Sequence, residues 1–204
     1  MFLYCTQITM SRTLVNLVTA YLGESQARNR YTFFASKARK EGFLQISDIF
    51  LETAEQEREH GSWFYKLAVA LKEKEGVSAN EVNIWEADVF VAVGSTMENL
   101  KFAVEGETHE YTALYPEFAR IADEEGYPEV AARFRFISNA EQHHAERYQK
   151  LYDQLDLGTL RIKEEDIERV CTQCGYVYKG KAPLKVCPAC GHDETYAVVK
   201  NENY

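Results

Sequence analysis

Residues 46–71 read ISDIFLETAEQEREHGSWFYKLAVAL, and residues 130–155 read VAARFRFISNAEQHHAERYQKLYDQL. Both stretches carry apolar residues at alternating spacings of three and four, which is the pattern of a helix with one buried face. In each stretch a glutamate, and a histidine three residues later, interrupt that face near its middle. These are Glu57 and His60 in the first stretch and Glu141 and His144 in the second. We therefore expect two helices that each bring a carboxylate and an imidazole into a helical core.

Two more stretches have a helical apolar face that acidic residues interrupt. Residues 17–38 place Glu24 on such a face, and residues 100–114 place Glu107 and Glu110 there. Burying these charges costs several kcal/mol per group unless positive charge accompanies them, because each ion loses its hydration. No lysine interrupts the four faces, whereas two divalent ions would bring four positive charges to five carboxylates. The sequence therefore predicts a buried pair of metal ions.

The predicted ligands combine carboxylates with imidazoles, a mixture that suits iron or manganese. By symmetry, Glu57 and Glu141 are expected to bridge the two ions, while Glu24 and Glu107 bind one ion each. The alternative to a metal site is a set of ion pairs between helices. Arg28 is the available cation near the four faces for such pairs.

Glu110 is one carboxylate more than a generic site of this kind needs. It lies one helical turn beyond Glu107, and it competes with His60 for a coordination position if both face the same ion. A carboxylate is a hard ligand that favours ferric iron, whereas an imidazole favours ferrous iron. We therefore hypothesise that Glu110 and His60 exchange at one iron when its oxidation state changes.

Signals for helix starts and ends divide the larger part of the chain into four helices. Gly42 and Gly76 follow predicted helices, and Ser95 with Glu98 forms a capping box. Pro116 is expected to kink or break the third helix. The predicted helices span about 11–40, 44–75, 96–125 and 128–155, with a crossover over residues 77–94. Two helical hairpins joined by a long crossover predict a mainly α fold, a ferritin-like four-helix bundle.

Four of the five cysteines form two Cys-x2-Cys pairs near the end of the chain: Cys171, Cys174, Cys187 and Cys190. In a chain without an export signal, this spacing indicates metal ligation rather than disulfides. A glycine after each pair lets the backbone turn toward the thiolates. Four thiolates accept zinc or iron, so the spacing leaves both a structural zinc ribbon and a redox-active iron open.

These signals predict four segments. We expect a disordered leader at residues 1–10, the helical bundle at 11–158, a charged linker at 159–168 and a small β module around the cysteines at 169–204. The last segment has too little apolar surface for a core of its own, so its order depends on a metal ion.

The composition excludes some classes of partner. The net charge of −9 does not supply the basic face that nucleic-acid binding needs. No apolar run approaches the roughly 20 residues that span a bilayer, and the N-terminus lacks the pattern of a signal peptide. We expect a cytoplasmic protein with neither a membrane nor a nucleic-acid partner.

Five segments together resemble the rubrerythrin family, and the resemblance covers nearly the whole chain after the leader. The leader itself departs from the family pattern. The five segments are Glu24-Ser25-Gln26-Ala27-Arg28-Asn29-Arg30-Tyr31, Glu57-Arg58-Glu59-His60, Glu107-Thr108-His109-Glu110-Tyr111, Glu141-Gln142-His143-His144 and the cysteine quartet. The resemblance implies a non-haem di-iron peroxidase whose ligands are Glu24, Glu57, His60, Glu107, Glu110, Glu141 and His144. It also implies that Tyr31 and Tyr115 donate hydrogen bonds to ligand carboxylates, with core packing as the alternative. We expect Glu110, His60, Tyr31 and Tyr115 to take part in catalysis.

The cysteine segment also resembles rubredoxin, through Tyr176-Val177-Tyr178 and the knuckle Cys187-Pro188-Ala189-Cys190-Gly191. This implies a single redox-active iron, a one-electron carrier that re-reduces the di-iron site after it converts hydrogen peroxide to water. The family resemblance further implies a head-to-tail homodimer, with a higher homo-oligomer as the alternative. A reductase that uses NADH or NADPH, or a small redox protein, is expected to supply its electrons. The alternatives are a ferroxidase that handles iron and a non-enzymatic protein whose zinc ribbon docks a partner.

Overall fold

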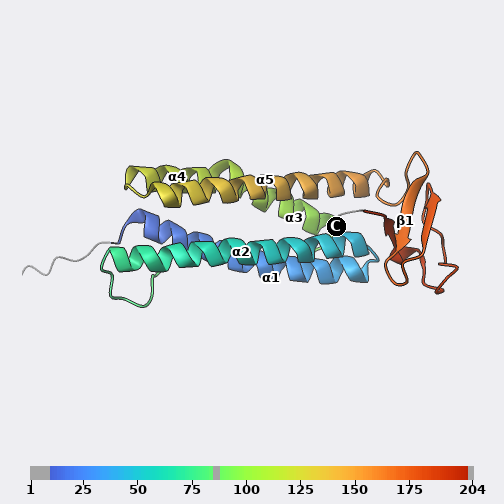
Figure 1. Ribbon diagram of the computed structural model, residues 1–204, viewed down its shortest axis with the longest axis horizontal. Coiled ribbons are helices and arrows are strands. Elements are labelled where there is room, and N and C mark those ends of the chain that lie inside the picture. Colours follow the sequence, from blue (N-terminus) through green and yellow to red (C-terminus); the bar gives the residue numbers. More distant parts are fainter. Residues whose placement is uncertain (1–9, 85–87, 202–204) are drawn as a thin grey trace, which may run out of the picture.

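A bundle of long helices forms the main part of the protein, and a small sheet lies at one end of it (Figure 1). The computed structural model describes residues 10–84 and 88–201. Its helices are α1 (Arg12–Lys40), α2 (Leu44–Lys74), α3 (Thr96–His109), α4 (Tyr115–Glu124) and α5 (Pro128–Asp156). α1 packs chiefly against α2, whereas α3 and α4 pack against α5. This is the predicted bundle of two hairpins, with the third helix divided into α3 and α4.

The predicted helix ends are confirmed to within about one residue because local signals set them. The Ser11 side chain accepts a hydrogen bond from the Leu14 N–H at the start of α1, and Ser95 and Glu98 form the predicted capping box at the start of α3. Gly42 and Gly76 adopt positive φ angles of 80° and 68° just past α1 and α2, a backbone conformation that glycine takes without strain.

The connection between α2 and α3 is the predicted crossover. α2 ends at the end of the bundle away from the sheet, whereas α3 begins at the sheet end (Figure 1). The intervening chain therefore runs along the bundle, although residues 85–87 lie outside the described residues. Residues 1–9 of the predicted leader lie outside them too. None of the described helices is long and apolar enough to cross a membrane.

A π-helical turn, Glu110–Leu114, joins α3 to α4. The Tyr115 N–H bonds to the Glu110 carbonyl five residues earlier, so this turn is wider than an α-helical one. Pro116 follows at the start of α4, where its missing N–H leaves no carbonyl of α4 unpaired. The expected kink or break is thus a local widening of the helix just before the proline.

Two hydrophobic clusters fill the bundle, one on each side of a buried polar layer. The cluster away from the sheet includes Leu14, Leu17, Phe64, Phe118 and Phe134. The cluster nearer the sheet includes Phe34, Ile46, Phe50, Leu100 and Tyr148. Between them lie charged side chains that are at most 2% exposed: Glu24, Glu57, Glu107, Glu141 and His144. The interruptions of the apolar faces therefore meet at one level of the bundle, as the sequence predicts.

A three-stranded antiparallel sheet follows the bundle. Its strands are β1 (Ile167–Cys171), β2 (Val177–Gly180) and β3 (Ala197–Val199), in the order β2-β1-β3. Arg169 of β1 is only 1% exposed. Its guanidinium donates hydrogen bonds to the carbonyls of Gly180, Arg161 and Lys181 at 2.7–3.0 Å. Carbonyl acceptors thus satisfy the buried cation, and a side-chain network replaces part of a hydrophobic core.

The sheet contacts the turn between α1 and α2. The Arg161 guanidinium donates a hydrogen bond to the Gly42 carbonyl and lies 5.3 Å from the centre of the Phe43 ring. A Cβ atom on Gly42 would lie 2.9 Å from Cγ2 of Thr195, next to β3. The close approach of the two parts therefore depends on a glycine at this turn.

We expect Gly42→Ala to destabilise the protein more than Gly76→Ala. Both substitutions force alanine into a left-handed conformation, which costs about 1–2 kcal/mol. A Cβ at Gly76 meets no atom within 4 Å, whereas one at Gly42 also displaces Thr195, which adds about 1 kcal/mol or more. Denaturant unfolding of the two variants measures the difference. Equal losses would show that the sheet does not hold Thr195 against this turn.

Candidate metal centre

Two overlapping groups of metal-ligating side chains lie in the polar layer of the bundle. The first group is Glu24 of α1, Glu57 and His60 of α2, and Glu141 of α5; the second is Glu57, Glu107 of α3, Glu141 and His144 of α5. In each group the candidate ligand atoms all lie within 4.8 Å of one another. Glu57 and Glu141 belong to both groups, which is the position expected of carboxylates that bridge two ions.

The distances within these groups match the spacing of ligands around a common ion. Nδ1 of His60 lies 2.9 Å from an oxygen of Glu57 and 2.9 Å from one of Glu141. Nδ1 of His144 lies 2.8 Å from an oxygen of Glu141 and 3.2 Å from one of Glu57. Two ligand atoms bound at right angles, each about 2.1 Å from one ion, lie about 3 Å apart. The side chains present therefore fit metal ions at this layer.

Several buried atoms of the layer form no hydrogen bond of acceptable geometry among the described residues, although some lie within 2.8–3.2 Å of another ligand atom. They are Oε2 of Glu24, Oε1 of Glu57, Oε2 of Glu107, both carboxylate oxygens of Glu141 and Nδ1 of His144. Such atoms are costly in a protein interior unless an ion binds them. In the described part of the chain, no lysine or arginine forms an ion pair with these glutamates, and Arg28 instead pairs with the exposed Glu55 at 3.7 Å. The geometry thus favours metal ions over ion pairs between helices.

In the absence of metal ions, protons must balance the negative charge of the layer. Burial and the charge of Glu141 raise the pKa of Glu24 well above its usual value. Burial and the charge of Glu57 raise the pKa of Glu107 to about 8. Burial opposes the charge on His144, but its polar contacts with Glu107, Glu141 and Glu57 raise its pKa to about 12. Metal binding must therefore displace protons.

Two tyrosines donate hydrogen bonds to Glu107 and Glu24, the two carboxylates that each belong to a single ligand group. Tyr31 of α1 donates a hydrogen bond to Glu107, and Tyr115 of α4 donates one to Glu24 at 2.5 Å. Both tyrosines are fully buried. The hydrogen bonds implied by the family resemblance are therefore present, and each fixes the orientation of a candidate ligand.

Tyr115→Phe is expected to weaken metal binding about 10–100-fold. The hydrogen bond from Tyr115 lowers the pKa of Glu24. Its removal lets Glu24 hold a proton to higher pH, so the pH midpoint of metal binding rises. Metal titrations over a pH series measure the shift. Tyr127→Phe is a matched control, because it removes a 3.0 Å hydrogen bond to Glu75 far from the layer. Equal effects of both variants would contradict the prediction.

Glu110 is the one predicted ligand that lies in neither group. It is the first residue of the π-helical turn, and burial and the charge of Glu107 raise its pKa well above the usual value. His60, by contrast, lies beside Glu57 and Glu141, the two carboxylates that both groups share. The structure therefore brings six of the seven predicted ligands together.

Gln56 is a further residue of the site that the sequence does not reveal. Its Oε1 lies 2.9 Å from Nε2 of His144, across 88 residues of sequence. Gln56 precedes Glu57 and lies off the apolar face of α2, which is the usual position of a glutamine on the surface of a helix. No pattern in the sequence distinguishes it, because its partner lies on another helix.

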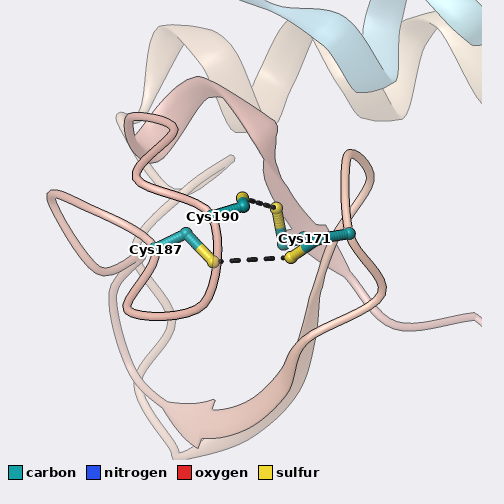
Figure 2. Close-up of side chains that lie close together, drawn as sticks. Cys171, Cys187 and Cys190 are labelled. Atoms are coloured by element: carbon teal, nitrogen blue, oxygen red, sulfur yellow. Dashed lines mark hydrogen bonds between the residues drawn. The ribbon is translucent and has the colours of Figure 1, made fainter.

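The second candidate site is the cysteine quartet, whose labelled thiols point into the space between two loops in Figure 2. The Sγ atoms of Cys171 and Cys190 lie 3.8 Å apart, and those of Cys174 and Cys187 lie 3.7 Å apart. These distances are far too long for disulfides. They match the edge of a tetrahedron with metal–sulfur bonds of about 2.3 Å, which is about 3.8 Å. The quartet therefore fits a single ion.

The backbone of the two cysteine loops places the four thiols close together. Gly175 and Gly191 both have φ angles of 76°. The N–H groups of these glycines bond to the carbonyls of Cys171 and Cys187, which closes each loop around its cysteines. Burial opposes the thiolate of Cys187, but backbone N–H groups of Ala189 and Cys190 lower its pKa to about 7. The loop thus stabilises the thiolate form that binds metal.

Comparisons with known proteins agree with both sites. The family model described as Rubrerythrin matches residues 16–152, and that of the rubrerythrin rubredoxin-like domain matches residues 170–196. A rubrerythrin of Clostridium perfringens is 47% identical over 195 residues, which are 95% of this chain and 97% of that protein. A rubrerythrin of Nitratidesulfovibrio vulgaris is 43% identical over 91% of this chain and 93% of that protein.

A solved structure of nigerythrin in a partially reduced state has the same overall arrangement. It superposes with a TM-score of 0.62 at 30% identity, and the match covers 98% of this chain and 92% of that one. The bundle is thus ferritin-like with a di-iron site, and the sheet carries a rubredoxin-like four-cysteine site. The chain belongs to the rubrerythrin family of di-iron proteins of oxidative-stress defence.

Proposed function

We propose that the protein is a cytoplasmic peroxidase that reduces hydrogen peroxide to water. The observation that carries this proposal is that buried carboxylates, which no lysine or arginine of the described residues pairs with, meet two imidazoles in the same chain as four converging thiols. The proposed di-iron ligands are Glu24, Glu57, His60, Glu107, Glu110, Glu141 and His144. The four cysteines hold a third iron.

Two ferrous irons held by these residues would supply the chemistry: they would polarise the O–O bond and provide one electron each, so that peroxide, two electrons and two protons balance two water molecules. The protein holds the ligands in place. Tyr31 and Tyr115 fix Glu107 and Glu24 through their hydrogen bonds. The side chain of His60 is 15% exposed and that of His144 only 3%, so the side of His60 is the more accessible to a small substrate.

Glu110 and His60 are proposed to exchange at one iron when the oxidation state changes. The position of His60 in the first group and of Glu110 outside both groups supports an arrangement with the imidazole bound. The π-helical turn at Glu110 supports a change of position, because such turns are rare overall but frequent at functional sites. Crystal structures of the oxidised and reduced protein test the exchange, and the same ligands in both would refute it.

Electron supply is proposed to come from the cysteine site of a second subunit in a head-to-tail homodimer. From Glu141 to the end of α5 at Asp156 the chain rises about 22 Å, at 1.5 Å per residue. The sheet lies beyond that end of the bundle (Figure 1). The long path within one chain supports a relay between subunits. A reductase that uses NADH or NADPH, or a small redox protein, would deliver single electrons to the cysteine-bound iron.

Rapid mixing of the fully reduced protein with hydrogen peroxide or with dioxygen tests the proposed activity. We expect the bundle irons to be oxidised at least about tenfold faster by peroxide, which corresponds to a barrier lower by about 1.4 kcal/mol. Equal or faster oxidation by dioxygen would contradict a peroxidase and indicate a ferroxidase. A protein that contains zinc alone would contradict both.

A further inference from the structure

The two histidines of the metal centre differ in the hydrogen bonding of Nε2, the ring nitrogen that points away from the carboxylates. His60 and His144 each follow a shared glutamate by three residues, and each turns Nδ1 toward the carboxylates. Nε2 of His144 lies 2.9 Å from Oε1 of Gln56. Within residues 10–84 and 88–201, Nε2 of His60 has no hydrogen-bond acceptor. The two ligand groups thus contain the same types of ligand, but only the imidazole of His144 has a hydrogen-bond acceptor behind it among the described residues.

The contact with Gln56 fixes the protonation and the orientation of His144. An amide oxygen only accepts hydrogen bonds, so Nε2 carries a proton, and Nδ1 is the nitrogen that must give up its proton to bind a metal ion. The amide itself is oriented, because its NH2 group lies 3.4 Å from a carboxylate oxygen of Glu52. Rotation of the His144 ring away from the metal centre would break this chain of contacts, whereas His60 can rotate without such a loss.

We infer that Gln56 is a positioning residue that holds His144 on its metal ion, and that this ion leaves more slowly than the ion bound by His60. The inference rests on the ligand set proposed above. An acceptor behind a ligand imidazole typically contributes 10–100-fold to metal affinity. Because His60 lacks such an acceptor, the ion that it binds is the one whose ligands can change.

Release of cobalt to a chelator tests the inference without relying on activity. In the cobalt-loaded protein, the four-thiolate site is followed separately by its sulfur-to-metal absorption. We expect the bundle cobalt to leave in two phases of equal amplitude, and Gln56→Leu to accelerate the slow phase about 10–100-fold. Gln56→Glu keeps an acceptor and should keep the slow phase. Gln142→Leu is the matched control, because Gln142 is exposed on α5 beside Glu141 and its side chain bonds, within the described part of the chain, to Glu146 alone.

A second measurement uses the unaltered protein and does not depend on how the variants fold. In cobalt-loaded protein labelled with 15N-histidine, the imidazole N–H groups of the two ligands give strongly shifted NMR signals. We expect one of them to exchange with deuterium at least about tenfold more slowly than the other. Equal exchange of both, or an unchanged slow phase in Gln56→Leu, would overturn the inference. Absence of both shifted signals would instead refute the ligand set.

Discussion

Replacing Glu141 by glutamine is expected to abolish paired metal binding and to lower kcat/KM for hydrogen peroxide more than about 100-fold. Glu141 belongs to both ligand groups, and its two oxygens lie 2.9 Å and 2.8 Å from the Nδ1 atoms of His60 and His144. An amide offers one acceptor atom, and its NH2 group would face a metal ion or an imidazole. Loss of a residue behind a ligand already costs 10–100-fold, so loss of a shared ligand should cost more.

Metal analysis and steady-state kinetics measure the effect of Glu141→Gln. Glu146→Gln is the matched control, because Glu146 lies on the exposed side of the same helix and should leave both quantities unchanged. Retention of two bundle metals and of normal turnover in Glu141→Gln would show that Glu141 does not bridge two ions.

The second large effect is expected from replacing Cys187 and Cys190 together by alanine. Peroxide turnover driven by an external electron donor should fall at least about 100-fold, because half of the thiolate ligands are lost. A structural ion contributes about 10–16 kcal/mol of apparent binding free energy to a small metal-dependent fold, so the sheet should also lose its order. By contrast, a chemically reduced bundle should react with peroxide in a single turnover at its usual rate.

Stopped-flow oxidation and donor-coupled turnover separate these two steps. Cys5→Ala serves as the control, because Cys5 lies outside the quartet and its removal should change neither step. Normal donor-coupled turnover in the double variant would contradict a relay through the cysteine site. A loss of the single-turnover reaction as well would mean that the quartet also maintains the bundle.

Local patterns were sufficient to predict most of the fold. The alternating apolar faces predicted the helices, since burial of one face is what stabilises each of them. Ser11, the pair Ser95 and Glu98, and the glycines after α1 and α2 predicted the helix ends. The inward position of Glu24, Glu57, Glu107 and Glu141 followed from their place on those faces, because helix geometry fixes the direction of each side chain.

Contacts between elements distant in sequence were not predictable in this way. Gln56 meets His144 across two helices, and Arg161 reaches Gly42 across 119 residues; neither contact leaves a periodic signal. The π-helical turn was predicted only as a disturbance near Pro116, because the missing N–H explains a break and does not select its form. Whether Glu110 or His60 lies beside the shared carboxylates of Glu57 and Glu141 depends on the whole site and not on helical spacing.

Diffraction data collected on both sides of the iron absorption edge test the central claim most directly. We predict three iron peaks in crystals of the iron-loaded protein: two adjacent peaks between the carboxylates of Glu57 and Glu141, and one among the four cysteine sulfurs. A single peak in the bundle, or none, would contradict a di-iron centre built from these side chains.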